Sequence, residues 1–388
     1  MSRVLVVADF FPPSARSGGA RSLASLVGRL GGRFDFRVVC RNHDVGDLEP
    51  YRDVPSGRWV ETRGARVFYL RRGDVGAASL RERIREAAPD LIHLNSVFSR
   101  LALRVLALRR LGLLGGIPLL LAPQGELSEG ALDHHRVRKR AVLGLLVASG
   151  ACRGLVWKAS DARERDEVLR VAGGDAEVRI APEPLPAEIP PPAGPRPPKE
   201  PGRLRLVFLG RVCAKKNLPH LLDALDGVGG HVEVDVRGPI EDRALWDRCV
   251  RKARGLAPHV GFSYGGPVAH EEVTGTLARS HVFVLPSLGE NFGHAILEAL
   301  AAGLPVLLSD RTPWRGLAPR RAGWDLPLED VGAFREVLRT LVAWDDRELG
   351  EWSRGARRLA LDVLSSDVSA AANEAVLREA VSFRGRSS

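Results

Sequence analysis

Two glutamates stand eight positions apart in the stretch from His281 to Asp310, HVFVLPSLGENFGHAILEALAAGLPVLLSD. Glu290 lies in a predicted loop, and Glu298 lies about two turns into a predicted helix, on the face that it shares with His294. The unpaired N–H groups and the dipole of that helix end favour an anion such as phosphate, and the shared face can turn to a cleft. The alternative is that both glutamates are solvated charges at a helix end, and their spacing alone favours neither.

Two apolar runs position this helix. Residues 282–285 and 304–308 are typical of buried strands. The loop residues 286–291 separate the first run from the helix, and Gly303 followed by Pro305 predicts its end. In such a strand–loop–helix–strand unit the helix begins at the carboxyl edge of a parallel sheet, so a phosphate would fit there.

The wider motif resembles the E-x7-E signature of the retaining, nucleotide-sugar-dependent glycosyltransferases of family 4. Its residues here are Glu290, Phe292, Gly293, Glu298, Ala299, Gly303, Leu304, Pro305 and Val306. A bare E-x7-E is common, but the preceding Pro-Ser and the following EALAAGLPV make the match specific. The resemblance implies an α/β protein with the GT-B fold, in which two Rossmann-like parallel-sheet domains face a cleft.

Length and composition are those of a two-domain protein of the cell interior. The 388 residues exceed one ordinary core. No apolar run approaches the roughly 18 residues that span a bilayer, and the N-terminus MSRVLVVADFF lacks the pattern of a secretory signal. The cysteines Cys40, Cys152, Cys213 and Cys249 show no metal-site spacing and are interpreted as reduced thiols of a cytoplasmic protein.

The net charge of +10 comes mostly from arginine. It suits anionic partners, namely sugar nucleotides, an acidic membrane surface or nucleic acid, although an arginine bias can also reflect genomic composition. The sequence lacks aromatic residues interleaved with basic ones and any nucleic-acid motif, which argues against nucleic acid.

The N-terminal half alternates predicted strands and helices, as in a parallel α/β sheet. The strands are expected at 3–8, 35–40, 66–70, 89–96, 117–121, 155–159 and 178–180, and the helices at 20–30, 77–87 and 161–172. Residues 9–19, a PP…GG loop, resemble the opening of family 4 enzymes, so the amides of Gly18 and Gly19 are expected near a phosphate or the acceptor. An ordinary βα turn is the alternative.

Candidate acceptor residues follow two strands of this half. His93 lies at a strand end on the ligand side of a doubly wound sheet, or is a satisfied interior histidine. The PQGELS-x-GAL stretch with its basic cluster resembles one branch of the family, and places Gln124 and Glu126 in the loop where many relatives have a histidine. Arg138 and Lys139 could reach phosphate oxygens, an anionic acceptor or a membrane, unless they form a solvated basic face.

A proline-dense segment at 182–202, PEPLPAEIPPPAGPRPPKEPG, predicts a semi-rigid linker between the domains. We therefore expect an acceptor-binding domain at 1–181 and a nucleotide-sugar-binding domain at 203–366. In the GT-B fold the last helix, here within 367–388, usually crosses back to the first domain.

The second half opens with a strand at 204–209 and a second family 4 signature, GR-x4-K, which picks out Arg211 and Lys216. A nucleoside diphosphate develops negative charge as it leaves, and a guanidinium with an ammonium can stabilise it. Each such charge-assisted bond contributes roughly 1.5 to 3 kcal/mol. Lys215 fits the spacing less well, and two solvated charges at a helix start are the alternative.

Further strands are expected at 231–237 and 259–263, and helices at 242–253, 331–344, 348–361 and 368–380. The resemblance places the nucleobase near Gly238, Pro239 and Tyr264, which could equally be plain turn residues. Trp314 could stack on a sugar or base, or cap the core.

The resemblance also assigns roles. It implies that Arg211 and Lys216 bind the diphosphate, that Glu298 holds the ribose hydroxyls, and that Glu290 contacts the donor sugar. The amides expected to assist belong to Phe292, Gly293 and His294.

The expected partners are a UDP- or GDP-linked sugar and a hydroxyl acceptor on a lipid-linked glycan, a polysaccharide or a small natural product. Peripheral contact with an anionic membrane is a further expectation, and no metal or other cofactor is expected. The alternatives are a sugar-nucleotide epimerase or a phosphorylase on the same fold, a basic nucleic-acid-binding protein, and a non-catalytic carbohydrate-binding relative. The last is disfavoured because both glutamates and the Arg/Lys pair are present.

Overall fold

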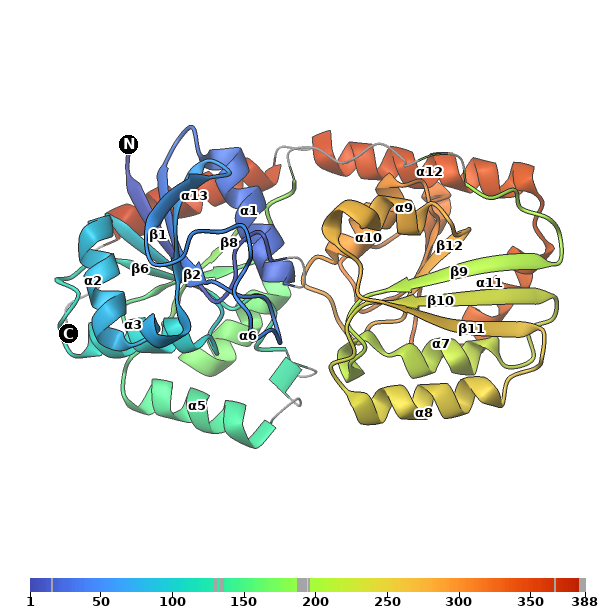
Figure 1. Ribbon diagram of the computed structural model, residues 1–388, viewed down its shortest axis with the longest axis horizontal. Coiled ribbons are helices and arrows are strands. Elements are labelled where there is room, and N and C mark those ends of the chain that lie inside the picture. Colours follow the sequence, from blue (N-terminus) through green and yellow to red (C-terminus); the bar gives the residue numbers. More distant parts are fainter. Residues whose placement is uncertain are drawn as a thin grey trace. The chain divides into compact units, whose positions relative to one another are not determined.

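The computed structural model describes residues 1–14, 17–128, 131–132, 136–186, 194, 196–365 and 368–383. The chain divides into two compact units, unit 1 with residues 1–187 and 366–388, and unit 2 with residues 188–365. Each unit has a mainly parallel sheet with helices on its faces (Figure 1). The predicted pair of Rossmann-like α/β domains is therefore confirmed.

The described part of unit 1 contains an eight-stranded sheet in the order β3-β4-β2-β1-β5-β6-β7-β8. The neighbouring strands are parallel except β3, which is antiparallel to β4. The strands are β1 Arg3–Ala8, β2 Asp35–Arg41, β3 Trp59–Thr62, β4 Ala65–Leu70, β5 Leu91–Asn95, β6 Leu119–Ala122, β7 Val156–Ala159 and β8 Glu177–Ile180. The helices are α1 Gly18–Leu30, α2 Ala77–Ala87, α3 Arg100–Arg110, α5 Arg136–Ala148, α6 Ala162–Ala172 and α13 Val368–Ser382.

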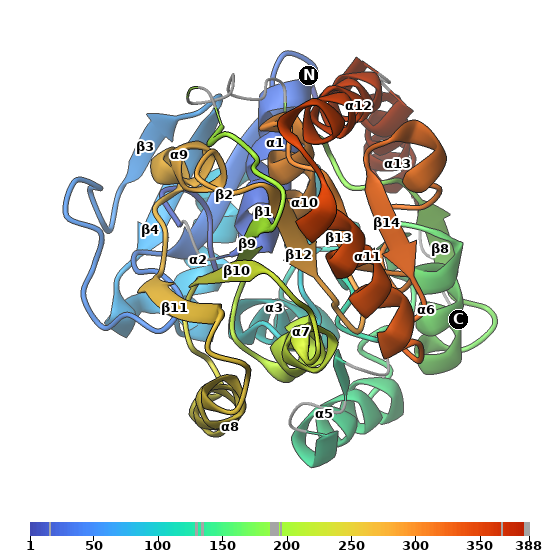
Figure 2. The same cartoon turned by 90° about the vertical axis from the view of Figure 1, so that its right-hand side faces the viewer.

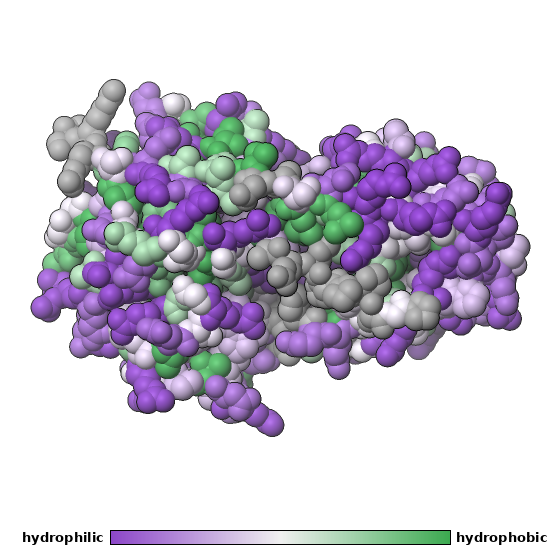
Figure 3. Space-filling view, turned by 90° about the horizontal axis from the view of Figure 1, so that it is seen from above, coloured by the Kyte–Doolittle hydropathy of each residue, from purple (hydrophilic) through white to green (hydrophobic). Residues whose placement is uncertain are grey.

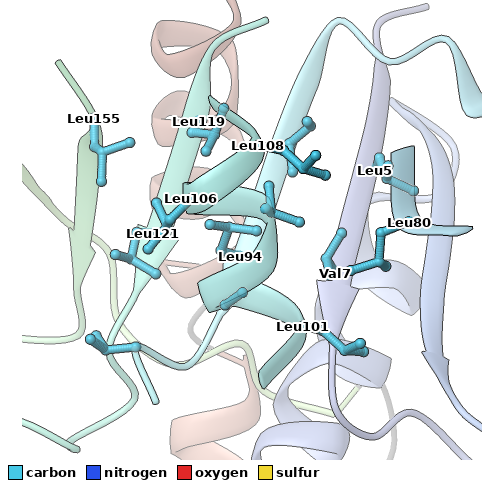
Figure 4. Packing of buried hydrophobic residues seen from close by; sticks show 14 of the residues in the cluster. Leu5, Val7, Leu80, Leu94, Leu101, Leu106, Leu108, Leu119, Leu121 and Leu155 are labelled. Carbon is cyan, nitrogen blue, oxygen red and sulfur yellow. The ribbon is translucent and has the colours of Figure 1, made fainter. Parts of the chain in front are cut away.

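The sheet of unit 1 is buried on both faces, which explains its continuous apolar strands. Leu5 and Val7 of β1 pack on one side with leucines of α2 and α3 (Figure 4). Val4 and Val6 pack on the other side with α1 and with Val376 and Leu377 of α13. Because successive side chains of a strand alternate between faces, one run of valines and leucines supplies both cores.

Unit 2 has a sheet whose described strands run in the order β11-β10-β9-β12-β13-β14, all parallel. The strands are β9 Arg203–Leu209, β10 His231–Arg237, β11 Val260–Gly266, β12 Val282–Leu285, β13 Val306–Ser309 and β14 Gly323–Leu326. The helices are α7 Leu218–Leu225, α8 Arg243–Arg254, α9 Val273–Leu277, α10 His294–Ala301, α11 Val331–Ala343 and α12 Asp346–Ser365. Short 3-10 turns lie at Arg72–Asp74, Ala214–Lys216, His270–Glu272 and Ala318–Arg320.

Both described ends of the proline-rich segment pack on their own units. Leu185 is buried, and its carbonyl accepts a bond from Arg29 of α1. Lys199 is 3% exposed, and its ammonium donates to the carbonyls of Val342 and Trp344. The central residues 187–193 and 195, on which much of the predicted linker falls, lie outside the described part of the chain.

Hydrophilic side chains cover most of the face shown in Figure 3. Within the described ranges, no helix combines the length and the apolar character needed to cross a bilayer.

Candidate functional site

Lys216 and Glu290 form a buried ion pair at the carboxyl edge of the unit 2 sheet. Lys216 lies in the turn after β9, and Glu290 lies in the loop after β12, the strand that pairs with β9. Lys216 Nζ is 2.6 Å from Glu290 Oε1, and the two side chains are 14% and 9% exposed. The fold therefore brings together two of the predicted catalytic residues, which are far apart in the sequence.

Ser287 fixes the position of Glu290. Its hydroxyl donates to Glu290 Oε1 at 2.6 Å, and its side chain is completely buried. The loop that carries both residues is also tied to the first loop, because the carbonyl of Lys215 accepts from the N–H of Leu288 at 2.8 Å. The carboxylate of Glu290 is thus held between two loops by contacts on both sides.

Positive charge dominates around Glu290. Burial alone would raise the pKa of Glu290, but the charges of Lys216 and Lys215 and the bonds from Lys216 and Ser287 outweigh it, so its pKa lies below the ordinary value. Burial lowers the pKa of Lys215, and the nearby Lys216 and Arg211 lower it further against the opposing effect of Glu290. The positive charges around the ionised Glu290 exceed its single negative charge, so a second anion could bind beside them.

Arg211 lies beside this cluster and pairs with Glu241. Its Nη1 is 2.7 Å from Glu241 Oε1, and the Arg211 side chain remains 44% exposed. No sequence pattern pointed to Glu241, because its loop follows β10 and no motif spacing links it to Arg211. An incoming phosphate would compete with Glu241 for the guanidinium.

The predicted nucleobase residues lie at the same edge of the sheet. Gly238 follows β10 with a φ of 128°, and a Cβ there would lie 2.1 Å from the carbonyl oxygen of Gly210. Only glycine permits this approach, which sets the backbone directly before Arg211. The hydroxyl of Tyr264 donates to the Gly238 carbonyl at 2.9 Å, and the Pro239 carbonyl accepts from the N–H of Val212.

The loop before α10 is braced by an aromatic contact. Gly293 precedes the helix with a φ of 82°, and the indole N–H of Trp314 donates to the carbonyl of Phe292 at 2.6 Å. Trp314 is 7% exposed, so its side chain belongs to the interior. The ring of Phe292 also lies 5.2 Å from that of His294, and Glu298 is half-buried one turn further along α10. Trp314 thereby holds the backbone at Phe292, directly before Gly293 and α10.

Gly18 and Gly19 form the first turn of α1, whereas the sequence predicted them in the preceding loop. The helix begins earlier because the Ser17 side chain accepts from the N–H of Ala20 and caps it. A Cβ on Gly19 would lie 3.1 Å from Nδ2 of Asn95, at the end of β5. Their amides therefore lie at a helix N-terminus at the carboxyl edge of the unit 1 sheet.

His93 is buried in unit 1, and Glu126 is partly buried in the same unit. His93 is 2% exposed, and burial together with the charge of Lys158 lowers its pKa to about 3. Glu126 accepts from Ser96 Oγ and from the N–H of Val97, each at 2.7 Å, and burial raises its pKa despite these bonds. The hydrogen bonds of Glu126 favour a structural role for that side chain.

The other acceptor candidates lie on the loop after β6 and on α5. Gln124 adopts a left-handed φ of 58° and is half-buried. Lys139 Nζ donates to the carbonyl of Ala131 at 2.5 Å and lies 5.2 Å from the ring of Phe98. Arg138 is exposed. Residues 129–130 of the PQGELS-x-GAL stretch, residue 133, and residues 134–135 of the basic cluster lie outside the described residues.

The cysteines are free thiols, and Cys40, Cys213 and Cys249 are buried. Burial raises the pKa of Cys152 and of Cys249 to about 11, which makes reactive thiolates of these residues unfavourable. Where side chains are described, no three His, Cys, Asp or Glu residues gather as a metal site.

The burial of His93 predicts an acid sensitivity of the fold. His93 keeps a neutral ring in the folded state, while the unfolded chain binds a proton below a pKa of about 6.5, so stability falls as the pH drops below that value. At about 1.4 kcal/mol per pH unit, the loss reaches about 3 kcal/mol at pH 4.5. Between pH 7 and pH 4.5, the free energy of unfolding measured in urea should fall by about 3 kcal/mol less in His93→Leu than in the wild type. Parallel stability curves for the two proteins would contradict this.

The fold is shared with solved glycosyltransferase structures. Sucrose-phosphate synthase from Thermosynechococcus elongatus aligns with a TM-score of 0.69 and 17% identity, covering 98% of this chain and 99% of that one. Anabaena HepE in complex with UDP-glucose aligns with a TM-score of 0.69 and 15% identity, covering 98% and 100% of the two chains. Identities this low show the GT-B fold alone.

Part of unit 2 matches a known family in sequence. Residues 203–343, which contain both Arg211–Lys216 and Glu290–Glu298, match the family Glycosyl transferases group 1. This part of unit 2 therefore resembles that family in sequence, and the chain as a whole has the GT-B fold.

The chain also resembles mycobacterial proteins. It is 31% identical over 169 residues to a phosphatidyl-myo-inositol mannosyltransferase of Mycobacterium leprae, covering 42% of this chain and 44% of that protein. It is 33% identical over 157 residues to a GDP-mannose-dependent alpha-mannosyltransferase of Mycobacterium tuberculosis, covering 40% and 37%. The chain thus spans less than half the length of these curated relatives.

Proposed function

We propose that this protein is a retaining hexosyltransferase, which moves a sugar from a nucleoside diphosphate to a hydroxyl acceptor. The observation that carries the proposal is the ionised Glu290, buried among Lys216, Lys215 and the nearby Arg211 at the N-terminus of α10. Cations and helix amides suit a diphosphate, and a carboxylate suits positive character on a sugar.

In the proposed reaction, the bond between the anomeric carbon and the phosphate oxygen breaks, and its electron pair stays on the phosphate. Arg211, Lys216 and the amides near Phe292, Gly293 and His294 stabilise that charge, while Glu290 steadies the anomeric carbon. The acceptor oxygen bonds to the same face of the carbon, and its proton passes to the leaving phosphate. Since protein cations meet the phosphate charge, the proposal includes no metal or other cofactor.

GDP-mannose is the first donor to test, because the names of several relatives specify mannosyl transfer and GDP-mannose. A UDP-sugar is the second, since HepE was solved with UDP-glucose. We assign Glu298 to the ribose, and Gly238, Pro239 and Tyr264 to the neighbourhood of the base. The acceptor is proposed to be a glycan or a lipid-linked saccharide, contacted from unit 1 by exposed candidates such as Arg138.

The test is proton NMR of the purified protein with a panel of sugar nucleotides, first without and then with glycan acceptors. We expect slow hydrolysis of one α-linked donor and, with acceptor, an α-linked product. A β-linked product would contradict retention. Interconversion of the sugar nucleotide alone, or release of the sugar onto added phosphate, would instead establish an epimerase or a phosphorylase.

A further inference from the structure

The guanidinium of Arg211 has a carboxylate partner that the two sequence motifs do not include. Nη1 of Arg211 lies 2.7 Å from Oε1 of Glu241, and the two side chains are 44% and 31% exposed. A guanidinium carries five N–H donors, so a ligand can bind Arg211 while the bond to Glu241 remains. Arg211 is thus partnered by an anion of the protein at the place proposed for the diphosphate.

Backbone hydrogen bonds join the two loops that carry this pair. The N–H of Val212 donates to the carbonyl of Pro239 at 2.9 Å. In return, the carbonyl of Val212 accepts from the N–H groups of Glu241 and Asp242, each at 3.1 Å. Because Val212 directly follows Arg211, these bonds fix the two backbones from which the paired side chains extend.

The fold does not require the side chain of Glu241. The neighbouring Asp242 accepts from the N–H of Leu245 at 2.9 Å and caps α8, the helix that lies below β11 in Figures 1 and 2. Within the described ranges, Arg211 is the one hydrogen-bonding partner of the Glu241 carboxylate. An exposed pair of this kind adds little to stability. The role of this carboxylate therefore lies with Arg211.

Glu241 also lowers the positive charge of the cluster. The three cations Arg211, Lys215 and Lys216 and the carboxylate of Glu290 together carry a net charge of +2, which Glu241 reduces to +1. Partial burial alone would lower the pKa of Arg211, but Glu241 and, more weakly, Glu290 act against it, so the pKa lies above its ordinary value. A nucleoside diphosphate carries several negative charges, so Glu241 weakens its attraction to the cations.

We propose that Glu241 is a positioning residue that holds the guanidinium of Arg211 before the donor binds and regains it as the nucleoside diphosphate leaves. The inference rests on the proposed function, in which Arg211 binds the diphosphate. While the nucleotide is bound, its phosphate oxygens and Glu241 compete for the same guanidinium, and their negative charges repel each other. Glu241 therefore limits the affinity for the diphosphate product and speeds its release.

The test is Glu241→Gln, which keeps an oxygen that can accept from Arg211 but removes the charge. The Kd of GDP or UDP, whichever binds more tightly in calorimetry, should fall about threefold to tenfold. Dissociation of that nucleotide, measured by surface plasmon resonance, should slow by a similar factor, and the KM of the active donor should fall. Loss of a merely structural contact would not tighten binding.

Glu233→Gln is the matched control, with circular dichroism as the check on folding. Glu233 forms an exposed pair with Arg205 at 3.2 Å near the amino end of β10, whereas Glu241 follows the carboxyl end of the same strand. Its removal should leave the Kd of the nucleotide unchanged. An equal gain of affinity in both variants would mean that net charge alone is responsible, and would overturn the proposal.

A double variant shows whether Glu241 acts through Arg211. Arg211→Ala/Glu241→Gln should bind the nucleotide within about twofold of Arg211→Ala, because the guanidinium for which the carboxylate competes is gone. A full gain of affinity in this background would contradict a positioning role.

The measurements separate failure of this inference from failure of the proposed function. If Arg211→Ala weakens nucleotide binding but Glu241→Gln leaves it unchanged or weakens it, the role of Glu241 is overturned and the diphosphate clamp stands. If Arg211→Ala and Lys216→Ala both bind the nucleotide as the wild type does, the clamp itself is overturned, and the role of Glu241 with it.

Discussion

Glu290→Gln is expected to abolish sugar transfer while leaving the protein folded. Glutamine keeps the shape of the side chain and can still accept the hydrogen bond from Ser287, but it removes the negative charge that Lys216 and Lys215 hold in place. If that charge stabilises the positive charge that develops on the anomeric carbon, its loss should slow turnover about a hundred- to a thousandfold.

Initial rates with the active donor measure the effect, and circular dichroism checks the fold. Glu336→Gln on α11 is the matched control, since it removes a carboxylate from an exposed face of the same unit. Its rate should equal that of the wild type. A Glu290→Gln protein with full activity would remove this residue from the mechanism.

Loss of Arg211 or Lys216 is expected to weaken nucleoside diphosphate binding. One charge-assisted bond contributes about 1.5 to 3 kcal/mol, which corresponds to an increase in Kd of roughly 10- to 150-fold. Lys216→Ala should have the larger effect, because it also removes the direct partner of Glu290 and leaves that carboxylate to repel the phosphates more strongly. Calorimetric titration with GDP and UDP measures both variants.

The coupling between Lys216 and Glu290 gives a sharper readout. The double variant Lys216→Ala/Glu290→Gln should bind the diphosphate more tightly than Lys216→Ala alone, because the repelling charge is gone. Lys252→Ala, which removes a cation paired with Asp223 on neighbouring helices of unit 2, is the control and should bind as the wild type does. Unchanged affinity in all variants would contradict the diphosphate clamp.

The alternating apolar runs predicted most of the fold, because buried parallel strands and amphipathic helices have strong periodic patterns. Two edge strands were missed. These are β3 and β14, which fall outside the strands predicted from the sequence. β14 depends on Gly323, whose φ of 148° lets the backbone approach Val306 so closely that a Cβ would clash with its carbonyl. A strand of this kind can be predicted only when the distant strand with which it pairs is known.

The contacts among the candidate site residues could be predicted only in part. Motif spacing selected Lys216 and Glu290, and the structure pairs them because β9 and β12 are neighbours. Contacts outside the motifs could not be predicted, since Glu241 reaches Arg211 from another loop and the indole N–H of Trp314 braces the carbonyl before Gly293. Sequence reasoning also could not decide that His93 is interior, which follows from its burial beside Lys158.

The most direct test is a crystal structure of the protein grown with GDP or with UDP, whichever binds more tightly in calorimetry. We predict the diphosphate within hydrogen-bond distance of Arg211, of Lys216 and of the first amides of α10, with the Lys216 ammonium shared between phosphate and Glu290. A diphosphate bound away from Lys216 and α10 would contradict the account.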